Sequence, residues 1–449
     1  MARPLWHDEV FTVWASRLAP SELVRVLRFD SGPPLFYLIE KPFVAAAESL
    51  ALSDATDRLV SFLAIAALFF AARRLPAGAR PRFLWLAASS PLLLLYSSEA
   101  RAYGLLALLG FVLFRLAARD APQAAGRAAI ALVAAILSWT HYLGAVLAGS
   151  LLIGCLVVKR RRAAAAIGLG LVLFLPWVPV LLSQPAAAMS WIRDRVGVSA
   201  AGFLASLGGS VRVLPPFGRP LPEPVLWLAC AAGLGLLVLL LFLRPMDADA
   251  RLGLSAVLVT LGGIAAVSLW RPAAVAGRSE MAVLPIWLWL AARAGESSRG
   301  ARRSVAAIAA IGIVSSLLIL TSPRASRPLA EVPARLESSA RAGDLVVATA
   351  NFYLPALLAR DRGRLGGHLR AFPADLENHP GWFRSEAPSE NDYRQLAGEI
   401  ARTAPGATVF LLLDPPYWTP RLRDALPARG APARPETLSY GILVVSPAR

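Results

Sequence analysis

The sequence has few charged residues and almost no lysine. Only 17% of its 449 residues are charged, 56% are hydrophobic, and lysine occurs only at Lys41 and Lys159. Soluble domains carry about 25% charged residues, so this composition and a mean hydropathy of +0.56 exclude a soluble globular protein. A helix that crosses a bilayer needs roughly 20 mostly apolar residues, and such runs recur along most of the chain. We therefore predict a polytopic integral membrane protein.

Cysteine is scarce as well, and several common catalytic motifs are missing. The two cysteines, Cys155 and Cys230, lie inside apolar runs and lack the spacing of metal ligands. The sequence contains no glycine-rich phosphate loop, no zinc-like Cys/His pattern and no nucleophile elbow. These absences argue against nucleotide-driven pumps and against hydrolases of the soluble type.

Basic residues outnumber acidic ones, and their positions predict the topology. The net charge of +17 does not indicate nucleic-acid binding, because the arginines occupy short connections between apolar runs. The apolar runs predict helices at 58–73, 82–97, 101–118, 128–142, 143–158, 163–182, 224–243, 252–270, 281–294 and 304–321. Basic residues cluster in alternate connections, near 73–82, 115–127, 159–162, 244–251 and 293–303. By the positive-inside rule, these five connections are cytoplasmic.

The other connections must then lie on the outer, non-cytoplasmic face. They are residues 1–57, 97–101, the turn at His141, and residues 183–223, 271–280 and everything after 322. The segment 33–51 is apolar, but Pro33, Glu40 and Lys41 disfavour a span. We expect it to form an interfacial helix on the outer surface.

The chain therefore divides into three predicted parts. They are an outer-face segment at 1–57, a transmembrane helical domain at 58–322 and an extracytoplasmic α/β domain at 323–449. In the third part, β-rich runs at 344–350, 408–414 and 441–446 alternate with helical patterns at 330–341 and 392–401. The predicted fold class is an α-helical polytopic membrane protein of about ten to eleven transmembrane helices with a small C-terminal extramembranous α/β domain.

The predicted outer-face position of the N-terminal segment requires that this segment cross the membrane. Met1 precedes Asp8 by only seven residues, and no apolar helix stands before it in this sequence. We favour a start that lacks a first transmembrane helix over unaided translocation of a short tail.

Two acidic motifs stand in the N-terminal segment. Asp8 and Glu9 are adjacent within Trp6-His7-Asp8-Glu9, and Asp30 opens a run that continues through Pro33 and Pro34 to Tyr37. Carboxylates beside a membrane are costly to desolvate and are rarely placed there without a partner or a task. One carboxylate can act as a general base on an acceptor hydroxyl. The alternative is a solvated pair that caps a helix beginning near Glu9.

Three further motifs fall on the predicted outer face. Glu99, Arg101 and Tyr103 lie between two spans, where an arginine offers planar donors that match a phosphate. His141 stands at a helix end, and Arg278 directly precedes a span, where it could neutralise a leaving phosphate. Each motif has a structural alternative. The motif from Glu99 to Tyr103 could be an interfacial salt bridge with an aromatic anchor. His141 could be a hydrogen-bonded interfacial histidine, and Arg278 could be an arginine that snorkels to the membrane surface.

In their order, these motifs resemble the GT-C superfamily of membrane glycosyltransferases, in the branch of protein O-mannosyltransferases and the lipid A aminoarabinose transferase. The matching segments are Trp6 to Glu9, Asp30 to Tyr37, Asp57 to Leu59, Ser97 to Tyr103, Thr140 to Tyr142 and Leu175 to Trp177. They cover about residues 4–185, and the rest of the chain matches only in layout. Gly32 stands where family members often carry a histidine, so the sequence departs from the family pattern at that position.

The resemblance implies an inverting transfer of a sugar from a polyprenyl-phosphate carrier to an acceptor on the non-cytoplasmic face. It makes Asp8 the candidate base with Glu9 beside it, and Arg101 and Arg278 candidates for the phosphate. Asp30, Tyr37, Glu99, Tyr103 and His141 are candidates for holding the substrate. We expect no cofactor and no metal, although some relatives bind a divalent cation. The expected partners are the lipid carrier, an acceptor and membrane lipid, without nucleic acid.

Two other classes of function remain open from the sequence. A lipid or solute transporter would carry ionisable residues or broken helices near the middle of the bilayer, whereas these charges stand at helix ends. A non-catalytic GT-C homologue would not need Asp8, Glu9, Glu99 and Arg101 together. The arginine bias and alanine richness favour a GC-rich bacterial genome, and hence an inner membrane with a periplasmic active face.

Overall fold

The computed structural model forms two compact units, which are described separately. One unit is Ser31–Arg324, and the other combines Ala2–Asp30 with Ala325–Arg449. The described residues are 5–50, 55–120, 123–184, 200–210, 221–242, 246–270, 273–297, 299–321, 332, 336–349, 354, 357, 369–374, 388–403, 407–412, 434–436 and 442–445. The predicted boundaries after residues 57 and 322 stay predictions.

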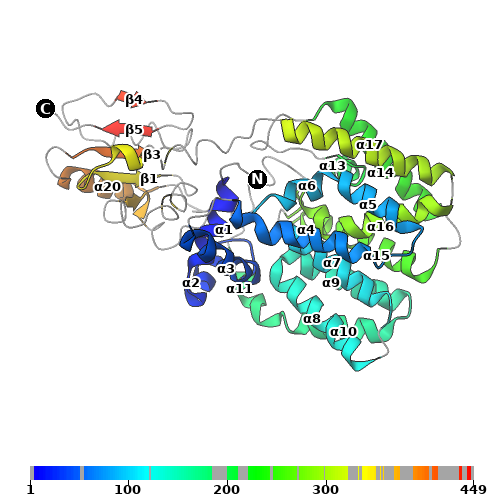
Figure 1. The fold of residues 1–449 in the computed structure, drawn as a ribbon. Helices are drawn as coiled ribbons and strands as arrows, with labels where there is room; N and C mark the ends of the chain where they lie inside the picture. The colour runs from blue at the N-terminus through cyan, green and yellow to red at the C-terminus, as the bar shows by residue number, and fades with distance from the viewer. Residues whose placement is uncertain are drawn as a thin grey trace. The chain divides into compact units, whose positions relative to one another are not determined.

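The first unit consists of helices (Figure 1), and each of the ten predicted spans is helical. Eight of them are single helices: α4 (Leu59–Ala72), α7 (Tyr103–Ala117), α8 (Ala124–Thr140), α9 (Tyr142–Val157), α14 (Glu223–Phe242), α15 (Ala248–Val267), α16 (Leu284–Ser297) and α17 (Arg299–Thr321). The other helices of this unit are α3 (Leu35–Ser49), η1 (Thr56–Arg58), α13 (Ala200–Leu207) and η4 (Ser279–Ala282). The helix α3 occupies the segment expected at 33–51, and its place at a membrane interface stays a prediction.

Two predicted spans are interrupted at prolines. The span at 82–97 is divided into α5 (Ala79–Ser89) and α6 (Pro91–Ser97) at an extended Ser90, whose side chain accepts a hydrogen bond from the N–H of Leu93. The span at 163–182 is divided into α10 (Arg161–Val172), η2 (Leu175–Trp177) and α11 (Val178–Ser183). Proline lacks an N–H and clashes with the preceding turn, so regular helical hydrogen bonding ends there.

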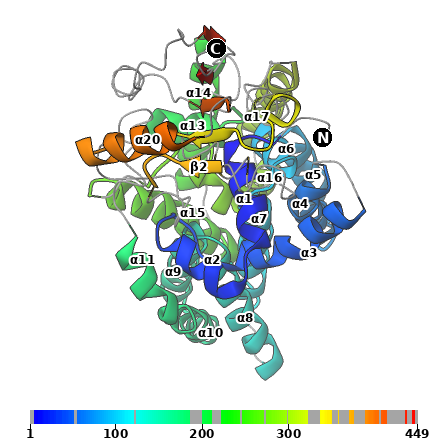
Figure 2. The ribbon, with the colours of Figure 1, turned by 90° about the vertical axis from the view of Figure 1, so that its left-hand side faces the viewer.

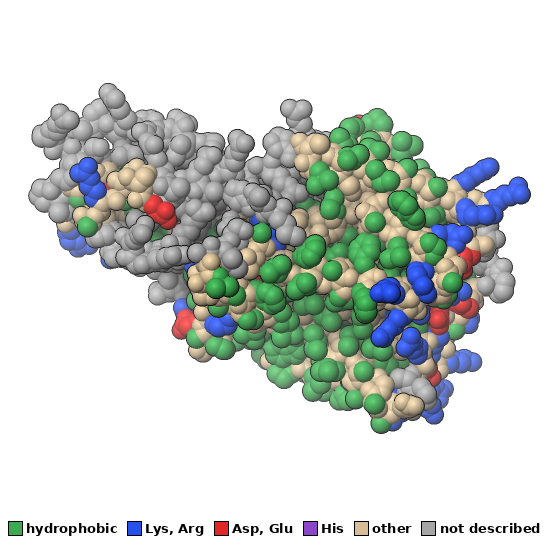
Figure 3. Space-filling model, in the orientation of Figure 1, with side chains coloured by type: hydrophobic (Ala, Val, Ile, Leu, Met, Phe, Trp, Pro, Cys, Tyr) green, Lys and Arg blue, Asp and Glu red, His purple; other side chains and the backbone are tan. Residues whose placement is uncertain are grey.

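The helical unit has the length and composition of a membrane domain. Among the described residues, four stretches are long and apolar enough to cross a bilayer, and three shorter helices are also apolar. The four are Arg161–Ser183, Glu223–Phe242, Ala248–Val267 and Arg299–Thr321. Figure 3 shows apolar side chains over much of the near face of the helical unit, and Trp227 and Phe242 are largely exposed. Such surfaces match lipid rather than water, so the chain is an integral membrane protein.

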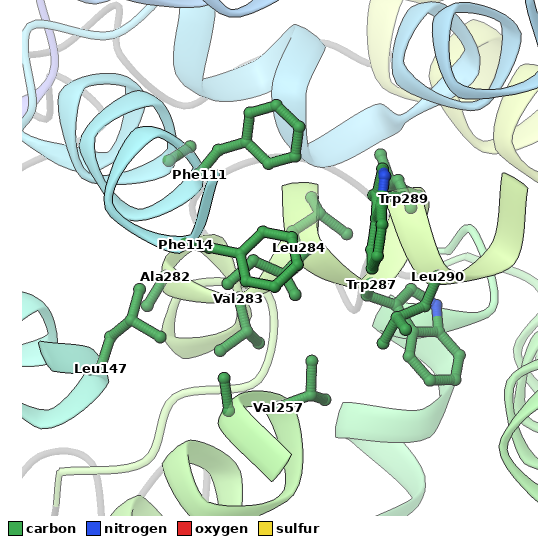
Figure 4. Packing of buried hydrophobic residues seen from close by; sticks show 14 of the residues in the cluster. Phe111, Phe114, Leu147, Val257, Ala282, Val283, Leu284, Trp287, Trp289 and Leu290 are labelled. Carbon is green, nitrogen blue, oxygen red and sulfur yellow. The ribbon is translucent and has the colours of Figure 1, made fainter. Parts of the chain in front are cut away.

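The core of this unit surrounds α7 and α16. In Figure 4, Phe114 lies edge-on to Trp289, with ring centroids 4.9 Å apart. Phe111 lies beside them, and Trp287 and Trp289 have no exposed surface. The helices α8, α9 and α10 contact one another and lie together in Figures 1 and 2. This packed core fixes the ends of α7, α8 and α9 relative to one another.

The second unit combines two N-terminal helices with a five-stranded sheet. The helices are α1 (His7–Arg17) and α2 (Pro20–Leu27), and the C-terminal part contributes α20 (Glu390–Arg402) and a helical turn at 336–339. The strands are β1 (Leu345–Ala348), β2 (Leu369–Ala371), β3 (Val409–Leu412), β4 (Arg434–Glu436) and β5 (Ile442–Val445), in the order β2-β1-β3-β5-β4. Val10 of α1 shares an apolar cluster with Val346 and Phe410 of the sheet, which explains why α1 belongs to this unit.

The predicted small α/β domain is therefore confirmed. β1 pairs in parallel with β2 and β3, whereas β5 pairs antiparallel with β3 and β4. The three β-rich runs of the sequence became β1, β3 and β5, and the pattern at 392–401 became α20. The strands β2 and β4 have three residues each, too few for an alternating pattern to stand out. Within the helical pattern expected at 330–341, the described residues 332 and 336–339 are helical.

Candidate active site

One end of the helical unit collects five of the candidate residues, namely Glu99, Arg101, Tyr103, His141 and Arg278, and the other end collects arginines. Tyr103 begins α7 and Arg115 stands in its last turn, about 18 Å away at 1.5 Å per residue. His141 separates α8 from α9, whereas Arg127 stands near the start of α8 and Lys159 follows the end of α9. The basic side chains gather at this second end of the unit in Figure 3.

An aromatic column forms the centre of the first end. The ring centroids of Tyr96 and Tyr103 are 4.5 Å apart, and those of Tyr103 and His141 are 5.3 Å apart. The Arg101 guanidinium carbon lies 6.0 Å from the Tyr103 ring centroid. The rings of Tyr96 and Tyr103 are buried, so α6, α7 and the turn after α8 hold them by packing. Arg101 is thereby kept beside a rigid aromatic wall.

The position of Arg101 is fixed by a tight turn between α6 and α7. Its N–H donates to the carbonyl of Glu99 at 2.8 Å, and its own carbonyl accepts from Ser61 Oγ of α4 at 2.8 Å. Gly104 permits this approach of α4, because a Cβ atom there would lie 2.9 Å from the Ser61 carbonyl oxygen. The side chain of Glu99 is fully buried.

His141 is held as a neutral imidazole. Its backbone is extended, and its Nδ1 accepts a hydrogen bond from the N–H of Leu143 at 3.1 Å, which caps α9. Burial lowers its pKa to about 3, with additional contributions from the positive charges of Arg101 and Arg278. Since Nδ1 accepts, we assign the single ring proton to Nε2. His141 is therefore a hydrogen-bond donor at neutral pH rather than a cation.

Arg278 stands in a compact loop that precedes α16. The loop turns at Gly277, whose φ of 85° favours glycine. The N–H of Gly277 donates to Glu280 Oε2 at 2.8 Å, and its carbonyl accepts from the Tyr96 hydroxyl at 2.9 Å. The Ser279 hydroxyl oxygen accepts from the N–H of Val275 at 3.0 Å. Arg278 is half-buried, and its charge acts on both His141 and Tyr96.

Sequence analysis gave Glu280 no role, although it is fully buried here. Burial raises its pKa to about 8, against an opposing effect of hydrogen bonds that include the N–H of Gly277. The available signal was an acidic residue two positions after an arginine at the entry to a span. Tyr96 was visible in the motif before Arg101, but its partner Gly277 is 181 residues away.

The adjacent carboxylates Asp8 and Glu9 belong to the second unit, at the start of α1. Glu9 is fully buried, unlike the solvated pair of the structural alternative, and its Oε2 accepts from the N–H of Trp6 at 3.2 Å, which caps α1. Asp8 is half-buried, and its carbonyl accepts from the Thr12 hydroxyl at 3.0 Å. Their roles in catalysis stay predictions.

The remaining candidates are divided between the two units. Asp30 is a buried residue of the second unit. Tyr37 is buried on α3 of the first unit, next to the ring of Phe36. The structure thus brings together Glu99, Arg101, Tyr103, His141 and Arg278 in one unit, around the Tyr96 side chain.

Comparison with known proteins gives a match of structure rather than of sequence. No protein-family model and no curated protein sequence matches the chain. The structure is similar to that of ArnT from Cupriavidus metallidurans bound to undecaprenyl phosphate, with a TM-score of 0.59 and 14% identity, over 97% of this chain and 96% of ArnT. The apo structure of the same protein gives a TM-score of 0.60, also at 14% identity, over 99% of this chain and 94% of ArnT. The chain has the fold of ArnT.

The likeness in fold bears out the resemblance that the sequence motifs indicated, and it extends over nearly the whole chain rather than residues 4–185 alone. Within the described part of the chain, no group of three or more His, Cys, Asp or Glu side chains is arranged to hold a metal ion. The site residues that are brought together are two arginines, a neutral histidine, two tyrosines and a buried carboxyl. This set suits the recognition of an anion and of hydroxyl groups.

Proposed function

We propose that the chain is an inverting glycosyltransferase that moves a sugar from a polyprenyl-phosphate carrier to an acceptor hydroxyl. The observation that carries the proposal is the placement of Arg101 and Arg278 about His141 at one end of a GT-C membrane domain. Two cations near one half-buried imidazole favour an anionic ligand, and a lipid phosphate at the membrane surface supplies one. ArnT, which has the same fold, is known bound to undecaprenyl phosphate.

The chemistry needs a base, an acceptor and stabilisation of the leaving phosphate. In this proposal, Asp8 removes the proton of the acceptor hydroxyl as its oxygen attacks the anomeric carbon, and the bond to the lipid phosphate breaks. Arg101 and Arg278 neutralise the charge that develops on the phosphate. Holding the reactants in place contributes the rest of the rate enhancement.

The other candidates serve orientation. Glu9 orders the start of α1 and thereby the neighbouring Asp8, while Asp30 and Tyr37 serve as substrate contacts. Glu99, Tyr103 and His141 hold the sugar, with the Nε2 proton of His141 as a donor. No cofactor is required for this displacement, and the sugar and acceptor are left open. The reaction takes place on the non-cytoplasmic face, which we place at the periplasmic side of a bacterial inner membrane.

The test is transfer of radiolabelled sugar in proteoliposomes from a panel of polyprenyl-phosphate sugars. We expect Asp8→Asn to lower the rate by about 10² to 10⁴, since a general base is lost. Glu22→Gln is the matched control, because Glu22 lies in the same unit in an exposed pair with Arg25. A folded Asp8→Asn variant with the wild-type rate would contradict the base assignment. Lipid that redistributes between leaflets without transfer would instead support a transporter.

A further inference from the structure

The loop that carries Arg278 is held from two sides at a single residue. The N–H of Gly277 donates to the carboxyl of Glu280, and its carbonyl accepts from the hydroxyl of Tyr96. Both hydrogen-bonding groups of one peptide residue are therefore bound by side chains, one from within the loop and one from α6. Glu280 has no exposed surface and Tyr96 is 4% exposed, so water cannot readily replace either contact.

The residue that is held in this way is the immediate neighbour of Arg278. Gly277 has a left-handed backbone, and such a turn persists when the surrounding contacts determine it. The same Tyr96 ring packs against Tyr103, which in turn packs against His141. The loop and the aromatic column are thus one connected structure, and a displacement of Gly277 would move Arg278 relative to His141.

From this arrangement we propose that Tyr96 and Glu280 are positioning residues, which hold Arg278 at the lipid-phosphate site through Gly277. The inference rests on the proposed function for the identity of the ligand. Neither side chain needs to touch the substrate. Tyr96 acts through its hydroxyl, and Glu280 acts as a hydrogen-bond acceptor, a role that a neutral carboxyl or a carboxamide also performs.

The first experiment measures binding of undecaprenyl phosphate to the full chain in nanodiscs. Arg278→Ala removes a charge-assisted contact and is expected to weaken binding by about 10- to 100-fold. Tyr96→Phe keeps the ring and loses only the hydroxyl, and we expect it to weaken binding about 3- to 10-fold. We expect a loss of the same size from Glu280→Ala. Glu280→Gln is expected to bind within about 2-fold of wild type, because its amide oxygen accepts the same hydrogen bond.

The decisive comparison is the double variant. If Tyr96 acts through Arg278, then adding Tyr96→Phe to Arg278→Ala produces no further loss. A purely structural loss would weaken binding in both backgrounds by the same factor. Ser316→Ala is the matched control, because its buried hydroxyl also donates to a distant backbone carbonyl, that of Ser89 at 3.2 Å. We expect this control to bind as wild type does, and equal losses in the single and double variants would overturn the proposal.

A second measurement tests, without any ligand, whether the hydrogen bonds of Tyr96 and Glu280 to Gly277 hold the loop; we call this pair of contacts the clamp. Hydrogen exchange of the peptide that covers residues 275–281 is expected to accelerate in Tyr96→Phe and Glu280→Ala, but not in Glu280→Gln or Ser316→Ala. Unchanged exchange in the first two variants overturns the clamp, whatever the binding data show. Accelerated exchange in a protein whose wild type does not bind undecaprenyl phosphate would keep the clamp and remove the proposed ligand. The two failures are therefore distinguishable.

Discussion

The buried carboxyl of Glu280 gives a pH-dependent stability that can be isolated by one substitution. In the folded chain burial raises its pKa from the ordinary 4.5 to about 8. Between these values the folded state retains a proton that the unfolded state has released. Stability must therefore fall as pH rises through this window, and the loss is complete above pH 8. Glutamine does not titrate, so Glu280→Gln removes this dependence and keeps the acceptor for Gly277.

The magnitude follows from the width of the window. Each pH unit corresponds to about 1.4 kcal/mol, so the full effect is on the order of 5 kcal/mol. Glu280 is fully buried, and solvent screening does not reduce it. For a chain of this length, an unfolding entropy of about 2 cal/mol/K per residue converts that energy to roughly 5 °C in the unfolding temperature.

The assay is thermal unfolding in detergent micelles at pH 5 and pH 9, for wild type, Glu280→Gln and Ser316→Ala. At pH 5 the glutamine variant should be close to wild type, because the wild-type carboxyl is neutral there. At pH 9 it should be the more stable protein by several degrees, while Ser316→Ala should differ from wild type equally at both values. Parallel curves for wild type and Glu280→Gln across this range would refute the reasoning.

Three further predictions concern single contacts. Glu9→Ala should lower stability by about 1 kcal/mol through loss of the cap on Trp6, whereas Glu9→Gln should retain it, as thermal unfolding will show. Because the pKa of His141 is lowered to about 3, wild type should lose stability relative to His141→Asn as pH falls from 6.5 toward 4, with no inflection from this residue in the transfer rate near pH 6.5. Gly104→Ala should cost about 1–3 kcal/mol in the same assay, because the added methyl group meets the backbone of Ser61. If Gly104→Ala is as stable as wild type, α4 and α7 can move apart without a loss of stability.

The helices of the membrane unit were predictable because apolar runs of this length have few alternatives in a bilayer. Hydropathy averages over a window, and for that reason it did not divide the span at 82–97, where Pro91 ends the hydrogen-bonding pattern at Ser90. The three-residue strands β2 and β4 were missed for a related reason. Their identity depends on pairing with β1 and β5, which are distant in sequence.

The candidate site was predictable where a residue's own chemistry reveals it. Arg101, His141 and Arg278 stand at polar helix ends, and the alternation of basic connections places those ends together. Tyr96 and Glu280 were not found, because both bind the backbone of Gly277 and no property of their own sequence neighbourhood specifies that partner. Such contacts depend on tertiary structure, and only coordinates or covariation can reveal them.

The orientation of the membrane unit gives a last prediction, which follows from charge alone. The arginine-rich end is bound internally as well: Arg293 pairs with Asp247 at 2.9 Å, and the guanidinium groups of Arg115 and Arg293 lie 5.6 and 5.4 Å from the centroid of the Trp289 ring. Translocating this end would require moving many cations across the bilayer, each at a cost of several kcal/mol. The end with His141 carries fewer charges and can cross more readily.

We therefore expect opposite labelling of two exposed positions in a variant whose two cysteines are replaced. Ser183→Cys, at the end of α11, should react with a membrane-impermeant maleimide in right-side-out vesicles. Arg302→Cys, near the start of α17, should react only after permeabilisation, because the positive-inside rule keeps it cytoplasmic. Labelling of Arg302→Cys in sealed vesicles, with protection of Ser183→Cys, would show that the topology is the opposite of the predicted one. A carrier lipid presented on the outer leaflet could then not reach Arg101 and Arg278, and the proposed reaction would have to occur on the cytoplasmic face.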